Sequence, residues 1–271
     1  MATSNAPSPL PAVLSPSRAL DFLQCPLLFR FRTIDKLPEE PQPAAVRGTL
    51  VHAVLERLYE LPTGSRDLDS ALALVEPQWS QLQQDQPELQ ELFSDQTELA
   101  TWLEEARAAV RTYFTMEDPD RLEPHQRELR LEVTLNSGLR LRGYVDRLDV
   151  ATAGIRVVDY KTGRAPPARF TDKSRFQIYL YALMVWHELG EVPKRLQLMF
   201  LADGGWLWYE PTEAELREVE AEITDIWRRI EETAQHGQWR PQRSKLCGWC
   251  AHQAHCPEFG GTPPPLPQSS S

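Results

Sequence analysis

The chain has 271 residues, 41% of them hydrophobic and 25% charged, and its formal net charge is −10 at pH 7. A chain of this length can bury a substantial core, and no apolar run approaches the roughly 20 residues that a membrane helix needs. The acidic balance argues against a protein that coats nucleic acid through bulk charge, but it does not exclude a local basic groove.

The first part of the chain predicts a tail followed by helices. Residues 1–14 are rich in Pro, Ser and Ala, which is typical of a disordered tail. They also lack the basic start and long apolar run of a secretory signal, so we expect a cytoplasmic protein. Ser15 or Ser17 can cap a helix through ALDFLQCPLLFRFR. A second helix, VRGTLVHAVLERLYE, carries His52, and residues 62–120 predict a helical insertion.

From about residue 126 the pattern changes to strands. The segment RELRLEVTL alternates between apolar and polar side chains, and residues 139–146 do the same. After small and turn-prone residues at 151–154, a second alternating segment reaches Lys161. We therefore expect a hairpin that brings Asp146 near Asp159, with Lys161 one side-chain repeat further along.

The rest of the chain predicts a helix (KSRFQIYLYALMVWHEL), two strands (KRLQLMFLA and WLWYE) and a long helix (EAELREVEAEITDIWRRIEETA). The order of helices, three strands, helix, two strands and helix predicts an α/β fold around a mixed sheet. We expect one domain over residues 15–260, followed by a flexible tail at residues 261–271.

The residues Asp146, Asp159 and Lys161 would place two carboxylates and an ammonium at one point of the hairpin. Hard cations such as Mg²⁺ and Mn²⁺ take oxygen ligands, and two carboxylates from adjacent strands can hold one. Such a metal polarises a phosphodiester and lowers the pKa of bound water, while Lys161 would orient that water or stabilise developing charge. An Asp-x-Lys triplet also occurs by chance, and acidic residues near strand ends are commonly solvated or paired.

Asp146 together with Asp159-Tyr160-Lys161 resembles the signature of the PD-(D/E)XK nucleases in their RecB-like form. The resemblance covers most of the chain, and the family's Pro before the first Asp is replaced by Val145. Four segments carry it in the family's order: GTLVH at 48–52, GYVDRLD at 143–149, VDYKTG at 158–163 and QIYLY at 177–181. It implies a restriction-endonuclease-like core in which helices flank a mixed central sheet, with an added helical insertion.

The resemblance also implies roles for single residues. It makes His52 a metal ligand together with Asp146, Asp159 and the carbonyl of Tyr160, and it makes Lys161, Gln177 and Tyr181 members of the catalytic site. Without it, His52 would be interpreted as a surface or packed histidine. Gln177 and Tyr181, four residues apart on one helix face, would be an ordinary helix edge. Glu132 offers a further acidic group, which a solvated strand face explains equally well.

Four cysteines form a second group: Cys25, Cys247, Cys250 and Cys256. In an intracellular chain a C-x2-C-x5-C cluster more often binds metal than forms disulfides. Spacing alone leaves zinc, to which His252 and His255 could add ligands, beside an iron–sulfur cluster. The layout is similar to that of AddB-type nuclease subunits and CRISPR-associated RecB-like exonucleases. That similarity implies a [4Fe–4S] cluster that ties residues 244–259 to the first helix as a structural staple.

Basic residues flank the segments that carry the proposed site, while acidic residues concentrate at 84–105 and 210–232. This segregation predicts a channel for a nucleic-acid backbone. Phe170 or Phe176 could stack on a base, or could belong to the core. The basic candidates for contact with DNA are Arg142, Arg147, Arg164, Lys173 and Arg175.

These features favour a metal-dependent DNA nuclease, specifically an exonuclease that acts on single strands or DNA ends in repair or recombination. The alternative is a catalytically idle, iron–sulfur-stabilised DNA-binding subunit of a helicase–nuclease complex. A third interpretation is a zinc-stapled scaffold that binds no nucleic acid. The 271 residues contain no G-x4-G-K-[ST] phosphate loop, so a helicase partner would be a separate chain.

Overall fold

The structure, a computed structural model, describes residues 10–167, 169 and 171–267. The expected tail up to residue 9 and the last four residues lie outside this range. The chain divides into two compact units. The first comprises Met1–Glu40, Leu131–Gly143 and Ala214–Ser271, and the second comprises Pro41–Arg130 and Tyr144–Glu213. The prediction of one domain over residues 15–260 stays a prediction.

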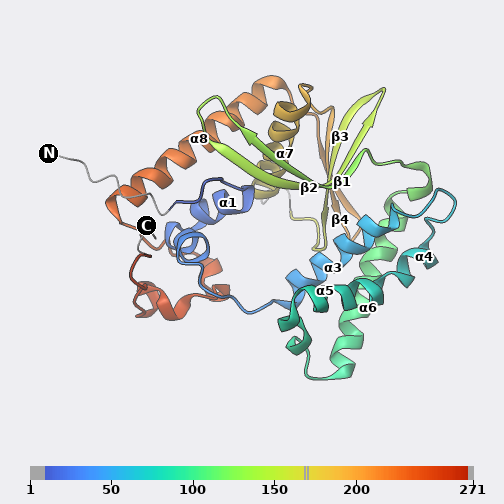
Figure 1. Ribbon diagram of the computed structural model, residues 1–271, viewed down its shortest axis with the longest axis horizontal. Helices are drawn as coiled ribbons and strands as arrows, with labels where there is room; N and C mark the ends of the chain where they lie inside the picture. The colour runs from blue at the N-terminus through green and yellow to red at the C-terminus, as the bar shows by residue number, and fades with distance from the viewer. Residues whose placement is uncertain (1–9, 168, 170, 268–271) are drawn as a thin grey trace. The chain divides into compact units, whose positions relative to one another are not determined.

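A five-stranded sheet has the strand order β1-β2-β3-β4-β5, and its strands β3, β4 and β5 belong wholly to the second unit (Figure 1). β3 pairs antiparallel with β2 and parallel with β4, and β4 pairs antiparallel with β5, so the sheet is mixed. The α/β fold with a mixed central sheet is therefore confirmed. The strands are β1 (Gln126–Thr134), β2 (Arg140–Ala151), β3 (Gly154–Lys161), β4 (Arg195–Phe200) and β5 (Gly205–Tyr209).

The expected hairpin is formed by β2 and β3, and its last pair is Ala151 with Gly154. Gly154 has a φ of +116°, a region that side-chain-bearing residues rarely adopt, and a Cβ there would meet the side chain of Lys194. Val157 and Val158 are both fully buried although their side chains point to opposite faces. β3 is therefore a central strand that is covered on both sides.

Helices α3 to α6 cover one face of β3 and β4. Their core includes Val158, Tyr160 and Met199 from these two strands. The side chains of Asp67 and Asp95 cap α4 and α6 by accepting backbone N–H groups. The stretch 62–120, where we expected a helical insertion, holds α4, α5, α6 and the turn η2. The helices are α3 (Pro43–Leu58), α4 (Leu68–Ala73), α5 (Val75–Asp85) and α6 (Gln96–Met116), with 3₁₀ turns η2 (Pro87–Glu91) and η3 (Pro119–Arg121).

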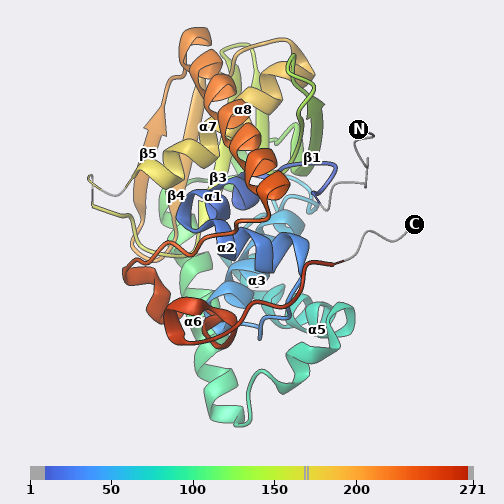
Figure 2. The ribbon, with the colours of Figure 1, turned by 90° about the vertical axis from the view of Figure 1, so that its left-hand side faces the viewer.

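The opposite face of β3 and β4 is covered by α7 (Asp172–Leu189), which supplies the crossover that a parallel strand pair needs (Figure 2). α7 ends at Gly190, whose φ of +74° gives the left-handed C-cap typical of helix ends. Its buried residues fill the space against the sheet, and its central turns carry Gln177 and Tyr181.

The first unit contains the beginning and the end of the chain. Ser15 caps the first helix by accepting the N–H of Arg18, as expected. Leu14 is fully buried and exchanges two backbone hydrogen bonds with β2, so the expected disordered tail ends before it. The elements are α1 (Pro16–Gln24), α2 (Pro26–Phe29), a π-helical turn η1 (Arg30–Ile34), α8 (Glu213–His236), and the 3₁₀ turns η5 (Lys245–Trp249), η6 (Gln253–His255) and η7 (Pro257–Phe259).

None of the helices within the described residues combines the length and the apolar character that crossing a membrane requires.

Candidate functional site

A wide cavity of about 1010 Å³ opens in the second unit. Its walls come from α3, from the strands β1, β2 and β3, and from the start of α7. Side chains of three chemical kinds meet in it: acids, bases and one exposed aromatic ring. The lining includes His52, Glu128, Tyr144, Lys161, Arg164 and Lys173.

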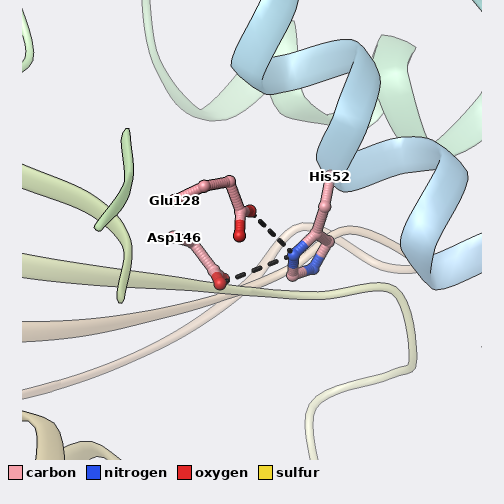
Figure 3. Close-up of side chains that lie close together, drawn as sticks. All are labelled: His52, Glu128 and Asp146. Atoms are coloured by element: carbon pink, nitrogen blue, oxygen red, sulfur yellow. Dashed lines mark ion pairs between the residues drawn. The ribbon is translucent and has the colours of Figure 1, made fainter. Parts of the chain in front are cut away.

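His52 from α3, Glu128 from β1 and Asp146 from β2 converge at one point, where His52 and Glu128 also line this cavity (Figure 3). The Nδ1 atom of His52 lies 3.5 Å from Asp146 Oδ1 and 3.8 Å from Glu128 Oε1. One potential ligand atom from each residue lies within 4.8 Å of the other two. On the other side of the ring, His52 Nε2 lies 3.0 Å from the carbonyl oxygen of Tyr160. The structure therefore brings the expected histidine, carboxylate and carbonyl together.

The sequence interpretation missed Glu128, which belongs to this group. Glu128 has a φ of +43°, a left-handed conformation that is strained for a residue other than glycine. The strand alternation from which we placed it on a plain polar face therefore breaks at this residue. Strain of this kind persists only where the surroundings impose it, and it occurs often at functional sites. Glu132, the acid considered instead, pairs with Arg140 and Arg142 within the first unit.

The electrostatics of the group favour a bound cation. Burial opposes the charged form of His52, but the carboxylates of Asp146, Glu128 and Asp159 outweigh it and raise its pKa to about 10. The ring is then protonated at neutral pH and donates to the carboxylates and to the Tyr160 carbonyl. A divalent metal would replace this proton, because a histidine ligand must be neutral.

Asp159 and Lys161 form the second half of the site. Asp159 is buried, and burial together with the charge of Asp146 raises its pKa to about 6. Lys161 Nζ lies 2.7 Å from Asp159 Oδ2 and donates a 2.9 Å hydrogen bond to Gln177 Oε1. Gln177 Nε2 in turn donates to the hydroxyl of Tyr181 at 3.1 Å. The four residues expected from the sequence therefore form one continuous chain of contacts.

The donor set fits a hard divalent cation. It consists of one imidazole nitrogen and the carboxylates of Glu128 and Asp146, a mainly oxygen environment of the kind that Mg²⁺ and Mn²⁺ prefer, and the buried carboxylate of Asp159 lies close enough to Asp146 for the charge of that residue to raise its pKa. The second oxygen of Asp146 accepts the backbone N–H of Tyr160 at 2.7 Å, which fixes the orientation of the carboxylate. The first oxygen is thereby directed at the histidine and the centre of the group.

The expectation that Arg147 contacts DNA is wrong. Its side chain is 1% exposed and points to the face of β2 opposite Asp146. The guanidinium donates to the hydroxyls of Tyr59 at 3.0 Å and Tyr160 at 2.7 Å, and it pairs with Glu117 at 2.8 Å. The helices α3 and α6 cover this face of β2. The charge pattern of the sequence does not reveal this packing, so it could not show that Arg147 is buried.

For the other basic candidates a role in DNA binding stays a prediction. Arg164 and Lys173 line the cavity, and the guanidinium of Arg175 lies 4.4 Å from the ring centre of Tyr179. Arg142, in the first unit, pairs with Glu132. Of the two phenylalanines considered for base stacking, Phe170 lies outside the described residues and Phe176 is half-buried.

The four cysteines gather in the first unit. Cys25 lies between α1 and α2, and the other three lie in and between the turns η5, η6 and η7. All four are free thiols and line one narrow cavity. Backbone N–H groups of Gln242 and Ser244 donate to the sulfur atoms of Cys25 and Cys247, both at 3.3 Å.

The spacing of these sulfur atoms is wide. Among the described residues, no three of them lie within 4.8 Å of one another. A zinc tetrahedron with Zn–S bonds of about 2.3 Å would hold them about 3.8 Å apart. Burial and the neighbouring thiols raise the pKa of Cys256. His252, considered as an extra ligand, is buried and hydrogen-bonded to Glu39 at 2.7 Å.

Comparison with known proteins connects this geometry to a family. A model of the PD-(D/E)XK nuclease superfamily matches residues 13–257. The Gene 69 protein of Mycobacterium phage L5 is 30% identical over 135 residues, which cover 49% of this chain and 44% of that protein. The Gene 69 protein of phage D29 is 25% identical over 273 residues, 90% of this chain and 96% of that one.

The fold also resembles a solved structure. A crystal structure of a proposed exonuclease from Eubacterium rectale superposes with a TM-score of 0.57 at 16% identity. The match covers 89% of this chain and 88% of the other. At this identity the likeness concerns the fold alone.

Proposed function

Because the chain belongs to the PD-(D/E)XK nuclease superfamily, we propose that it is a metal-dependent exonuclease that hydrolyses phosphodiester bonds in single-stranded DNA or at DNA ends. The observation that carries this proposal is the convergence of His52, Glu128 and Asp146 beside a cavity that His52, Glu128 and Lys161 line. A binding module needs no such set of ligands beside an ammonium group.

Each group has a role that follows from its contacts. His52, Glu128, Asp146 and Asp159, with the Tyr160 carbonyl, would hold Mg²⁺ or Mn²⁺. When bound, the metal polarises the phosphodiester and lowers the pKa of the attacking water. Lys161 lies beside Asp159 and is oriented by its hydrogen bond to Gln177. It would position the attacking water or stabilise the charge that develops on the phosphoryl oxygens.

Gln177 and Tyr181 act through Lys161. Gln177 accepts from the ammonium and donates to the Tyr181 hydroxyl, so the amide cannot rotate without losing one of the two bonds. Burial and the charge of Asp159 raise the pKa of Tyr181, which keeps its hydroxyl protonated. We therefore assign both residues a positioning role.

The test is digestion of end-labelled linear single-stranded DNA with Mn²⁺ or Mg²⁺, beside closed circular single-stranded DNA. We expect the linear strand to be degraded, the circle to be spared, and EDTA to stop the reaction. Lys161→Met and Asp159→Ala should lower the rate at least about a thousandfold. Lys194→Met, which alters an exposed lysine outside the cavity, is the matched control and should leave the rate unchanged.

Equal activity of Lys161→Met and wild type would refute the assigned site. Cleavage of the circular strand, which has no end, would show that the activity is that of an endonuclease. Binding of the strand without cleavage under all metal conditions would favour the alternative, a catalytically idle DNA-binding subunit.

We propose that the four cysteines hold a [4Fe–4S] cluster that fastens α1 to the C-terminal turns. Two observations support it: the thiols line one cavity, and two of them accept backbone N–H groups. Protein purified without oxygen should be brown and contain iron and acid-labile sulfide. Cys250→Ser should lose both, whereas a colourless protein with stoichiometric zinc would overturn the assignment.

A role in DNA repair or recombination is part of the same proposal. An exonuclease that needs an unpaired strand depends on a separate motor protein to unwind duplex DNA, and the chain carries no phosphate loop of its own. Affinity purification of the tagged Asp159→Ala protein in the presence of DNA should recover a helicase. Recovery of DNA alone would contradict this part of the proposal.

A further inference from the structure

Tyr144 is an aromatic side chain that the proposed chemistry does not use, although it lies in the reaction cavity. It lines the cavity with 49% of its surface exposed. It precedes Asp146 by two residues in β2, so both side chains project from the same face of the strand. Two residues along a strand correspond to about 6.7 Å, which is close to the length of one nucleotide of an extended strand.

The exposure of Tyr144 contrasts with the other aromatic residues at the cavity. Tyr160 and Phe200 also line it, but each is only 4% exposed. The hydroxyl of Tyr160 is engaged by Arg147 on the other face of the sheet. Among the described lining residues, Tyr144 therefore offers an aromatic ring with a face open to the cavity.

The charges of the cavity indicate the class of ligand that would contact the Tyr144 ring. Lys161, Arg164 and Lys173 supply positive charge suited to phosphate oxygens. A strand whose scissile phosphate lies at Asp146 needs an apolar surface for the adjoining base about one nucleotide away. Aromatic rings serve this purpose in proteins that bind single strands, because every base has a face that can stack.

We infer that Tyr144 stacks on the base of the nucleotide next to the scissile phosphate and thereby selects unpaired DNA. This inference rests on the proposed nuclease function. A base in a duplex is already stacked and paired, so it gains nothing from the ring unless the duplex opens. Tyr144 is then a specificity-determining residue that adds affinity for the strand without taking part in the bond cleavage.

The test compares Tyr144→Ala, Tyr144→Phe and Tyr144→Trp on a labelled oligodeoxythymidylate strand. Stacking on one base is worth about 1–3 kcal/mol, so Tyr144→Ala should raise KM roughly 5- to 150-fold while kcat changes less than about twofold. Tyr144→Phe should match wild type, and Tyr144→Trp should bind as tightly or more tightly. Trp208→Ala removes another exposed aromatic ring, 58% exposed on β5, and should change neither constant.

An abasic nucleotide placed at successive positions locates the stacked base. In wild type, one position next to the cleaved bond should raise KM as much as Tyr144→Ala does, and Tyr144→Ala should be insensitive to that substitution. An unchanged KM in Tyr144→Ala would overturn the inference, and so would a Phe variant as defective as the Ala variant.

The same substitutions separate this inference from the proposed activity. If wild type cleaves no DNA, the nuclease proposal fails, but fluorescence anisotropy with the same intact and abasic strands still measures binding. Weaker binding by Tyr144→Ala, together with the loss of sensitivity to the abasic position, would then support the stacking role alone. Equal binding by Tyr144→Ala and wild type would refute it.

Discussion

The two faces of β3 carry polar side chains of opposite character. On one face, Lys161 lines an open cavity and pairs with the buried carboxylate of Asp159, which is crowded by the carboxylate of Asp146. On the other face, the hydroxyl of Tyr160 meets the buried guanidinium of Arg147 beneath α3 and α6. One step along the strand therefore separates a site with unbalanced charge from a site with balanced charge.

On the face that carries the Tyr160 side chain, the charge of Arg147 is balanced by its neighbours. Arg147 contacts the hydroxyls of Tyr59, Tyr113 and Tyr160 and the carboxylate of Glu117. Burial works against its charge, but these neighbours raise its pKa, so it remains a cation. Such a cluster links α3, α6, β2 and β3 and serves stability and positioning, because a buried charge is tolerated only when it is paired.

The unbalanced face is where chemistry can occur. Burial and the charge of Asp146 raise the pKa of the Asp159 carboxyl to about 6, and the surrounding carboxylates raise the pKa of the His52 imidazole to about 10. The two faces share one strand, so the balanced cluster also holds the Tyr160 carbonyl where His52 meets it. Rigid support beneath a reactive surface is what an active site requires.

The comparison of the two faces predicts that Asp159→Asn lowers activity without lowering stability. Asp159→Asn removes a metal ligand and should lower the cleavage rate at least about a thousandfold. Its free energy of unfolding in EDTA at pH 7 should equal or exceed that of wild type, because a crowded buried charge is removed. Cleavage assays and urea denaturation of the same preparations measure both. A clearly less stable Asp159→Asn protein would contradict the view that this face is electrostatically strained.

Arg147→Met tests the other face. It removes one of the two arginines that pair with Glu117, the other being Arg156 at 3.0 Å, and it takes the guanidinium donor away from the hydroxyls of Tyr59 and Tyr160. The free energy of unfolding should therefore fall by about 3 kcal/mol. Arg195→Met is the matched control: its ion pair with Glu210 is exposed and should be worth less than about 1 kcal/mol. If Arg147→Met costs no more than Arg195→Met, the two faces do not differ as described.

The sequence predicted one of these faces well and the other badly. Strand alternation and the turn placed Asp146, Asp159 and Lys161 together, and helical spacing placed Gln177 beside Tyr181. These relations are local and follow from the periods of strand and helix. Arg147 was misjudged because only the packing of α3 and α6 decides that its face of β2 is buried. Glu128 was missed because its left-handed backbone breaks the period on which the prediction rested.

The smallest predicted effect is a dependence of stability on pH that arises on one face only. In EDTA, the folded pKa of Asp159 is about 6 and its ordinary value is 3.8. Between these values the folded protein binds more protons than the unfolded chain, so this group lowers stability as the pH rises from about 4 to 6, by at most roughly 3 kcal/mol. His52 adds no slope there, because its pKa is raised from 6.5 to about 10 and its contribution is complete below 6.5.

The measurement is the difference in the free energy of unfolding between wild type and Asp159→Asn across this pH range. Groups common to both proteins cancel, so the difference should move in favour of Asp159→Asn as the pH rises and level off above about 6. Arg147 and its tyrosines do not titrate in this range and should contribute nothing. Mn²⁺ should reverse the trend for wild type alone, because the metal binds the ionised carboxylate. If this difference in the free energy of unfolding instead moves in favour of wild type as the pH rises in EDTA, the pKa of Asp159 is lowered in the folded protein. Attraction from Lys161 and His52 would then outweigh burial and the repulsion between the carboxylates of Asp146 and Asp159.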